Sequence, residues 1–344
     1  MASASSLDIL RNLLRQFVLQ RRAVELQNNV ANIEELWTLL SDNRLCNLLR
    51  DDDRLFERQT AYRESVWSVN APALSTICLI APLFEKDSIP HLFIKGPLML
   101  HEVYQDYFFR PTTDVDVLVA SNDFYRAGAV LAEAGFVLEP DCKRVYWRIF
   151  LGEQHYYPPH KTLTVVDLHR RVRHPAGPAT MERFLDPVLR HKIGGRSVAV
   201  PTPVNLALLL VVYLLKGIMT YEAVGYFLLD LAMLLARMDE RAVHQLIAEA
   251  RERKLTLALC LALRAVRMIA PLSPLLEKEI NGQKLSLMSD AELFRQLLVP
   301  GIARTWPRIR ALIKTCDHVN DLAQAVAWEV GRKIAQRACG AHLF

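Results

Sequence analysis

The sequence predicts an α+β fold, in which a small mixed β-sheet core lies between an N-terminal helical region and a C-terminal helical domain. Apolar side chains recur at helical spacing in residues 1–88 and again in residues 202–344. Residues 89–201 instead alternate short β-branched runs with short helical segments. We therefore expect three parts, with borders near residues 88 and 201.

Residues 1–88 predict helices that pack against the part that follows. Apolar side chains within residues 10–17 follow the i, i+3, i+4, i+7 spacing of one helix face. Asn32 and Glu35 are placed as a capping box at the start of a further helix. Pro72 and Pro82 should break this helical region, because proline has no N–H to donate.

The middle part predicts the sheet. Strands are expected at 92–95, 114–119, 145–151, 161–167 and 197–200, and helices at 97–105, 122–134 and 179–190. Gly135 is a natural C-terminal cap for the helix that ends before it.

The last part predicts helices at 203–217, 222–238, 240–253 and 256–270, followed by a helical segment within 288–338. Thr202 and Pro203 form a cap followed by proline at the first helical position. The final segment is mildly basic, through Arg304, Arg308, Arg310 and Lys314. We expect a charge-laced surface there rather than a nucleic-acid face.

Composition narrows the class of protein. The 344 residues are 51% apolar with a net charge of +5, which suits a polyanionic ligand but falls short of a nucleic-acid footprint. The six cysteines are far apart and form no C-x-x-C motif, so we expect reduced thiols and a cytoplasmic location. Residues 1–10 show no signal-peptide pattern, and the apolar run 206–215 is shorter than about 18 residues, so no membrane partner is expected.

The main candidate site residues are Asp114 and Asp116, which are separated by one residue where the apolar run 115–119 begins. Alternate side chains on a strand share a face, so the two carboxylates should point the same way. Carboxylates held together repel unless a cation lies between them, and hard oxygen ligands suit Mg²⁺. A lone D-x-D can also simply begin a strand from a solvated loop.

The surroundings of the pair favour a metal site for a phosphorylated ligand. Lys95, Gly96 and Pro97 follow a short strand and precede a helix, a layout that brings backbone N–H groups to an anion. Asp167 ends the strand-like run 162–166, and would supply a third carboxylate from a neighbouring strand.

On these residues the sequence resembles the nucleotidyltransferase superfamily that shares the fold of polymerase β, and within it the "uncharacterised nucleotidyltransferase" family of bacteria. The resemblance rests on Lys95-Gly96, on Arg110 followed by the run 114–119, on the helix ending near Gly135, and on the run 166–169. It covers residues 90–201 well.

The resemblance implies a transferase that moves a nucleoside monophosphate from a nucleoside triphosphate to an acceptor. It implies that Asp114, Asp116 and Asp167 hold the metals, expected to be two Mg²⁺, and that Asp167 takes the proton of the attacking group. The Gly96 turn would cover the triphosphate, with Lys95 and Arg110 contributing phosphate contacts. The acceptor is open, and a small molecule, peptide or protein is favoured over nucleic acid.

One departure from the superfamily keeps a second interpretation open. A serine usually follows the glycine of the turn, whereas this chain has Pro97, which lacks both a hydroxyl and an N–H. The alternative is a non-catalytic nucleotide- or partner-binding module, such as an antitoxin-like or regulatory relative. A D-x-D glycosyltransferase is a third option, although its acidic motif follows an apolar strand instead of starting one.

Other polar residues have weaker signals. Four histidines fall between residues 155 and 174, namely His155, His160, His169 and His174, without the spacing of a zinc site. We expect His169 to share a strand face with Asp167, where it either touches the metal shell or the acceptor or is a hydrogen-bonded structural histidine. Lys216 and Asp230 stand inside apolar helical segments, where Lys216 either binds a phosphate or forms a buried ion pair with Asp230.

Overall fold

The computed structural model describes residues 4–27, 30, 32–144, 146–172, 182–283, 288–301 and 315–317, and positions 320, 322, 323, 326, 327, 330, 331, 334 and 337. The chain forms two compact units. The helical unit comprises Met1–Ser65 and Leu206–Val319, and the mixed unit comprises Val66–Asn205 and Asn320–Phe344. The predicted borders near 88 and 201 stay a prediction at the level of domains.

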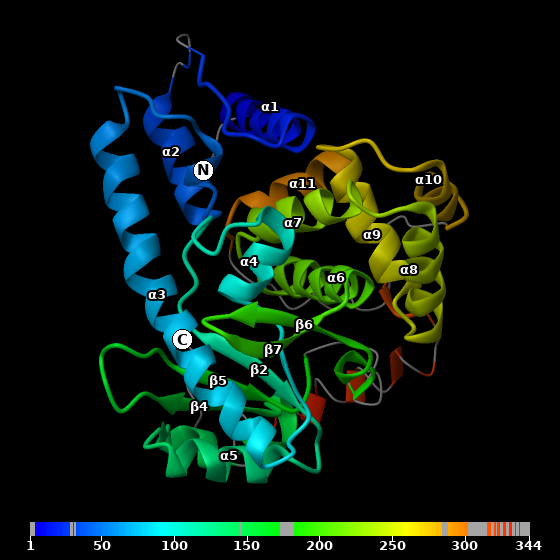
Figure 1. The fold of residues 1–344 in the computed structure, drawn as a ribbon. Helices are drawn as coiled ribbons and strands as arrows, with labels where there is room; N and C mark the ends of the chain where they lie inside the picture. Colours follow the sequence, from blue (N-terminus) through cyan, green and yellow to red (C-terminus); the bar gives the residue numbers. More distant parts are fainter. Residues whose placement is uncertain are drawn as a thin grey trace. The chain divides into compact units, whose positions relative to one another are not determined.

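The helical unit combines two segments that are far apart in the sequence. Its helices are α1 (Ala4–Gln20), α2 (Ile33–Asp42), the start of α3 (Phe56–Lys86), most of α6 (Pro203–Thr220), α7 (Gly225–Leu235), α8 (Glu240–Glu252), α9 (Thr256–Arg267), α10 (Pro274–Asn281) and α11 (Asp290–Leu298), with a short 3-10 helix at Cys46–Leu48 (Figure 1). The four helices predicted within 203–270 are confirmed, and α11 lies within the predicted segment 288–338, part of which is outside the described residues. Helix α10 is an additional helix between them.

Asn43 links the N-terminal helices to the C-terminal ones. It is fully buried after α2; its Nδ2 donates to the carbonyl of Leu298 at 2.7 Å, and its Oδ1 accepts from the N–H of Gly225 at 2.8 Å. A buried amide is stable only when its polar atoms are paired, so these bonds fix α2 against α7 and α11. The predicted cap is also confirmed, since Asn32 Oδ1 accepts from the N–H of Glu35 at 3.0 Å.

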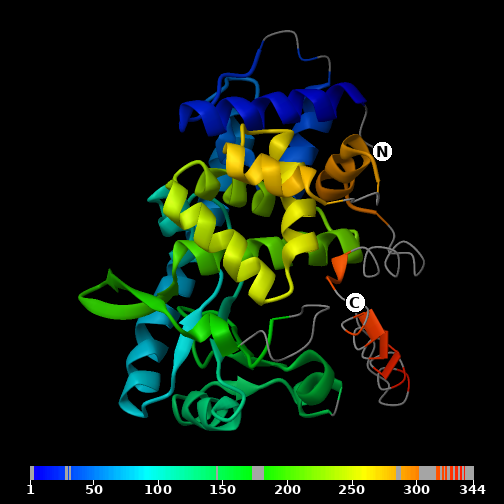
Figure 2. The ribbon, with the colours of Figure 1, turned by 90° about the vertical axis from the view of Figure 1, so that its right-hand side faces the viewer.

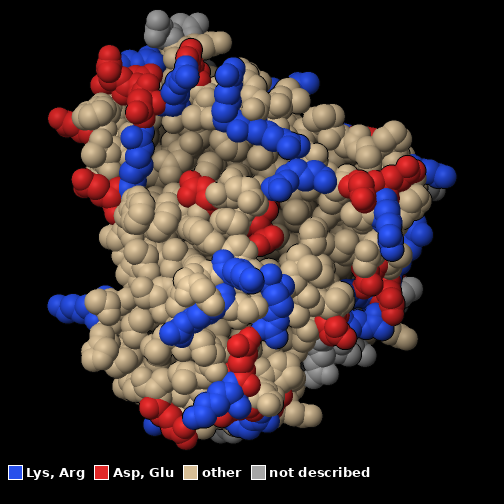
Figure 3. Space-filling view, viewed as in Figure 1, with Lys and Arg blue, Asp and Glu red and all other residues tan. Residues whose placement is uncertain are grey.

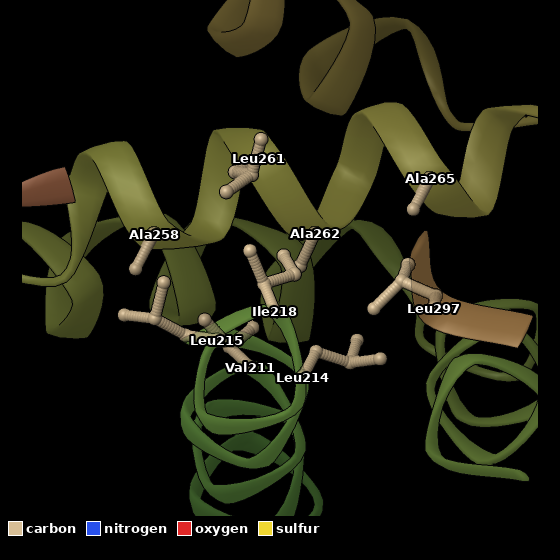
Figure 4. A pocket seen from close by; sticks show the side chains of 9 residues that line it. All are labelled: Val211, Leu214, Leu215, Ile218, Ala258, Leu261, Ala262, Ala265 and Leu297. Carbon is tan, nitrogen blue, oxygen red and sulfur yellow. The ribbon is translucent and has the colours of Figure 1, made fainter. Parts of the chain in front are cut away.

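The core of the helical unit is built around α6 and α9. Apolar side chains from these helices and Leu297 of α11 line a crevice that has no room for a water molecule (Figure 4). Two described helices, α3 and α6, are long and apolar enough to cross a membrane, and in α6 78% of the most apolar stretch is buried. This test is weak evidence for a membrane, because buried core helices pass it too.

Charges of both signs are mixed on the surface. Figure 3 shows Lys and Arg side chains interspersed with Asp and Glu on the face in view. The acidic run at residues 51–53 is ion-paired, since Asp52 pairs with Arg54 at 2.6 Å and Asp51 pairs with Arg63. This run is therefore a solvated, ion-paired segment. The basic residues predicted within 304–314 lie outside the described residues.

The mixed unit contains a five-stranded sheet and a separate hairpin. The sheet has the order β1-β2-β5-β4-β3. Its strands are β1 (His91–Phe93), β2 (Val115–Val119), β3 (Val137–Leu138), β4 (Glu153–Tyr157) and β5 (Val166–His169). Only β2 and β5 run parallel among these pairs; the other neighbours are antiparallel. The hairpin consists of β6 (Val188–Ile193) and β7 (Arg196–Pro201), seen from the side in Figure 2.

One face of the sheet is apolar and packs against two helices. Val117 of β2 and Leu168 of β5 join a buried cluster with Ile77 and Phe84 of α3 and Leu131 of α5 (Phe124–Glu133) (Figure 1). Because neighbouring side chains on a strand alternate, the residues between these apolar ones point to the opposite face. That face carries the polar residues considered below.

The prediction that Pro72 and Pro82 break the helical region is wrong, because α3 continues through both. A proline within a helix leaves the carbonyl four residues earlier without its usual donor. For Pro82 that carbonyl belongs to Cys78, and the guanidinium of Arg196 in β7 donates to it. Helix α3 also buries its apolar face on the sheet, which offsets the cost of the two prolines.

The second half of the sheet differs most from expectation. The prediction of a strand at 145–151 is wrong, since Tyr146–Leu151 is a π-helical turn with Tyr146 fully buried. The strand predicted at 161–167 begins later, at Val166. The helix predicted at 179–190 is wrong at its end, because Val188 opens β6; only a 3-10 turn, Glu182–Leu185, precedes it, and residues 173–181 lie outside the described residues.

Candidate active site

The sheet brings Asp116 and Asp167 together. Strands β2 and β5 are parallel neighbours, and their register pairs Asp116 with Asp167 directly. Paired residues in adjacent strands point to the same face, which here is the one opposite the apolar core. Asp116 is buried, and the side chain of Asp167 is only 13% exposed. Two carboxylates thus share one poorly solvated face of the sheet.

Asp116 is held by two cationic partners on one of its oxygens. Lys95, which follows β1 and precedes α4 (Pro97–Tyr104), places its Nζ 2.6 Å from Asp116 Oδ1, and His169 Nε2 lies 2.9 Å from the same atom. Burial alone would raise the pKa of Asp116, but the charge of Lys95 and the hydrogen bond from His169 outweigh it and lower the pKa. The second oxygen, Oδ2, is buried without a hydrogen-bond partner.

The surroundings of Asp167 raise its pKa, whereas those of Asp116 lower its pKa. Burial and the negative charges of Asp116 and Asp114 raise the pKa of Asp167 to about 7, and the nearby imidazoles of His155 and His169 only partly oppose the rise. The carboxyl therefore binds a proton more readily than an ordinary aspartate does. Like charges held together in this way are stabilised by a cation.

Gly96 lies beside the loop that holds Asp114. Its backbone has φ +83° and ψ −162°, a conformation that essentially only glycine adopts. A Cβ placed on Gly96 would lie 3.8 Å from the carbonyl oxygen of Asp114, so the glycine bend faces the start of β2. Pro97 takes the first position of α4 and is buried. The predicted order of strand, glycine bend and helix is present.

The donor set fits a divalent cation. Ligand atoms of Asp116, Asp167 and His169 lie within 4.8 Å of one another. The unpartnered Oδ2 of Asp116 and the raised pKa of Asp167 both indicate carboxylates whose charge is incompletely balanced by the protein. Carboxylate oxygens are the ligands that Mg²⁺ prefers.

Comparison with known protein families gives the family of this chain. The family described as "uncharacterised nucleotidyltransferase" matches residues 31–271. The chain belongs to this nucleotidyltransferase family. The resemblance noted from the sequence is thereby confirmed, and nucleotidyl transfer is supported as its general activity. The comparison with curated proteins gives no match.

In this nucleotidyltransferase the loop before Asp114 is anchored by a residue that the sequence did not reveal. Asn70 of α3 is fully buried, and its Nδ2 donates to the carbonyls of Tyr107 at 2.7 Å and Arg110 at 2.9 Å. Its Oδ1 accepts from the N–H of Thr112 at 2.8 Å and from the hydroxyl of Thr112 at 2.9 Å. One side chain therefore fixes residues 107–112, including the buried Arg110.

Asn70→Ala should destabilise the protein by about 2 kcal/mol or more and lower nucleotidyl transfer, because buried carbonyl and N–H groups lose their partner. Denaturant unfolding and a transfer assay would measure both effects. Asn281→Ala, at the exposed end of α10, is the matched control and should change neither. Unchanged stability in Asn70→Ala would show that water replaces the amide and that the anchor is dispensable.

Strand β4 contributes two further residues on the polar face. His155 Nε2 lies 2.7 Å from Glu153 Oε1 and 3.8 Å from Asp167 Oδ2, and its Nδ1 lies 3.1 Å from Glu139 Oε2. Burial would lower the pKa of His155, but the hydrogen bond to Glu153 and the charges of Asp167, Glu153 and Glu139 raise it to about 9. Glu153 was missed, although its alternation with His155 along 153–157 was a readable strand signal.

The remaining predicted residues have different outcomes. His169 lies beside Asp116, as expected for a side chain that shares a face with Asp167. Lys216 and Asp230 belong to the helical unit, where Asp230 is fully buried, and a role for Lys216 at the phosphate stays a prediction. His160 joins none of the candidate metal clusters among the described residues, and His174 lies outside them.

Proposed function

We propose that this protein is a Mg²⁺-dependent nucleotidyltransferase that transfers a nucleoside monophosphate from a nucleoside triphosphate to an acceptor, with release of pyrophosphate. The observation that carries the proposal is the direct pairing of Asp116 with Asp167 on parallel strands, with Oδ2 of Asp116 buried and unpartnered. Such an oxygen is costly unless something binds it, and a divalent cation meets that need.

The three carboxylates have distinct parts. Asp114, Asp116 and Asp167 would hold two Mg²⁺ ions, which neutralise phosphate charge and lower the pKa of the attacking group when bound. Asp167 is placed to accept the proton of the acceptor hydroxyl. The acceptor oxygen then bonds to the α-phosphorus, and the bond from that phosphorus to the pyrophosphate oxygen breaks.

The cationic residues serve the triphosphate. Lys95 balances the charge of Asp116, and its side chain is 27% exposed, so its ammonium group is accessible to a phosphate oxygen. Gly96 allows the backbone to approach the phosphates closely, because no Cβ projects from the bend. Arg110 is placed six residues after α4 and four before Asp114, where it adds positive charge. His169 orients Asp116 through its 2.9 Å contact.

Pro97 favours a second candidate function, a module that binds nucleotide or a partner without turnover. It is buried at the first position of α4, so the helix start offers neither a hydroxyl nor an N–H at that residue. A triphosphate would then be bound less firmly at the glycine bend. The two candidates differ in whether bound nucleotide is consumed.

Calorimetry with ATP and Mg²⁺, combined with a radiolabelled-triphosphate transfer assay, separates the candidates. The enzyme should bind each preferred triphosphate only with Mg²⁺ and should release labelled pyrophosphate when small-molecule, peptide and protein acceptors are offered. The double variant Asp114→Asn/Asp116→Asn should lose transfer but stay folded in a thermal melt. Transfer retained by that variant would contradict the mechanism, and tight binding without any turnover would support the module.

We place this activity in the cytoplasm. The described cysteines Cys46, Cys78, Cys142, Cys260 and Cys316 are free thiols, which is typical of a reducing compartment. Nucleoside triphosphates and Mg²⁺ are available there, so the location agrees with the proposed substrates.

A further inference from the structure

A second cluster of metal-binding side chains lies in the mixed unit and shares no residue with the Asp116 cluster. His101 and Glu102 lie on α4, and His191 lies on β6. One nitrogen of each imidazole and one oxygen of the carboxylate lie within 4.8 Å of one another. All three side chains are partly buried, and the proposed transfer reaction uses none of them.

The contacts within this cluster leave one ring nitrogen without a partner. His191 Nδ1 lies 3.1 Å from Glu102 Oε1, and His191 Nε2 lies 2.6 Å from the hydroxyl oxygen of Tyr107. The ring of His101 packs 4.4 Å from the Tyr107 ring and 4.5 Å from the His191 ring, measured between centroids. His101 Nδ1 is buried without a hydrogen-bond partner. A buried polar atom in that state costs stability unless a ligand meets it.

We propose that His101, Glu102 and His191 form a binding site for a transition-metal ion of the Zn²⁺ class. Two imidazoles and one carboxylate are a donor set that zinc accepts while one position stays open, whereas Mg²⁺ prefers oxygen ligands alone. Ligands about 2.0–2.1 Å from a tetrahedral zinc lie roughly 3.4 Å apart. The 3.1 Å between His191 Nδ1 and Glu102 Oε1 is close to that spacing.

Tyr107 completes the arrangement from outside the ligand set. With zinc on His191 Nδ1, the Nε2 atom carries the ring proton and donates it to the Tyr107 hydroxyl, which fixes the tautomer and the ring orientation. Asn70 in turn holds the backbone carbonyl of Tyr107. The ion links α4 to β6, and α4 begins at the glycine bend of the candidate active site, so the site stabilises that bend.

Zinc calorimetry on the metal-stripped full chain tests the proposal. His101→Gln and His191→Gln should each lower the affinity for one zinc ion by about 100-fold or more. Tyr107→Phe should lower the affinity for the same ion by about 10- to 100-fold. Cys142→Ser is the matched control, because Cys142 belongs to a separate Glu139–Cys142–His155 cluster that could also bind zinc. Unchanged affinity in both histidine variants, or loss in Cys142→Ser of the same zinc ion that the histidine variants are expected to affect, would overturn the proposal.

A crystal of the wild-type chain soaked with Zn²⁺ gives an answer that needs no variant to fold. We expect an anomalous peak about 2.0–2.2 Å from ligand atoms of His101, Glu102 and His191. A peak confined to the Asp116 or Cys142 cluster would refute the assignment. Neither outcome depends on nucleotidyl transfer, so the zinc site and the proposed activity stand or fall separately.

Discussion

Asp167→Asn should make the metal-free protein more stable while it removes nucleotidyl transfer. The charged carboxylate of Asp167 is buried and faces the negative charges of Asp116 and Asp114, which together raise its pKa to about 7. Asparagine has nearly the same shape and carries no charge, so it removes both costs. The gain is at most about 4 kcal/mol, the free energy that corresponds to a pKa raised from 3.8 to about 7.

The stability gain of Asp167→Asn should increase with pH. Between pH 3.8 and about 7 the folded protein keeps a proton on Asp167 that the unfolded chain releases, so wild-type stability falls as pH rises through that window. The advantage of Asp167→Asn should therefore be small near pH 4 and largest above pH 7. Mg²⁺ should reverse the order, because the wild type binds the ion more tightly and binding stabilises the folded state.

Thermal melts in EDTA and in Mg²⁺ across this pH range would measure the effect, together with a transfer assay. Asp8→Asn is the control, because Asp8 is exposed on α1 and forms only a surface pair with Arg11. It should leave stability and transfer unchanged. A metal-free Asp167→Asn protein that melts below the wild type at pH 8 would show that the contact with His155 outweighs the repulsion.

The acidic pairing could be predicted from sequence because its signals are local. Asp116 and Asp167 each stand beside a β-branched run, and strand alternation then places them without knowledge of the rest of the chain. Asp114 precedes β2, so its shared orientation stays a prediction. The glycine bend at Gly96 was predictable for the same reason. The register that sets Asp116 opposite Asp167 was expected only as strand adjacency, since nothing in either run measures the offset between them.

The features that were missed depend on distant partners. Asn70 is 37 residues from Tyr107 and 42 from Thr112, and a single asparagine in an apolar helix carries no sign of the loop that it anchors. Pro82 lies within α3 because Arg196, far along the chain, donates to the carbonyl of Cys78. The run 145–151 has the composition of a strand, yet burial of Tyr146 in a helical turn decides its structure. Tertiary contacts override local propensity in each case.

Asp116→Asn should also abolish transfer, but with the opposite effect on the metal-free protein. Lys95 and His169 both contact Oδ1 of Asp116, and their attraction outweighs the cost of burial, so the pKa of Asp116 is lowered. Removing the charge weakens both contacts that Oδ1 of Asp116 makes. Because the Lys95 side chain is 27% exposed, we expect a loss of only about 1–3 kcal/mol, less than for a fully buried pair.

This loss should persist from about pH 5 to pH 8, because a carboxylate with a lowered pKa stabilises the fold at every pH above its ordinary value. Transfer should fall about 1000-fold or more, since several kcal/mol of metal-derived stabilisation disappear with the ligand. A double-mutant cycle with Lys95→Met, measured by denaturant unfolding, would isolate the interaction between Asp116 and Lys95. The sum of the stability losses in the two single variants should exceed the loss in the double variant.

Opposite signs at two directly paired residues would be hard to explain without the proposed electrostatics. A purely structural role for both carboxylates predicts that each asparagine variant loses stability, and a purely solvated pair predicts that neither changes. Stabilisation in Asp167→Asn together with destabilisation in Asp116→Asn requires one carboxylate that is compensated by Lys95 and one that is not. An uncompensated carboxylate beside a compensated one is the state that a divalent cation stabilises on binding.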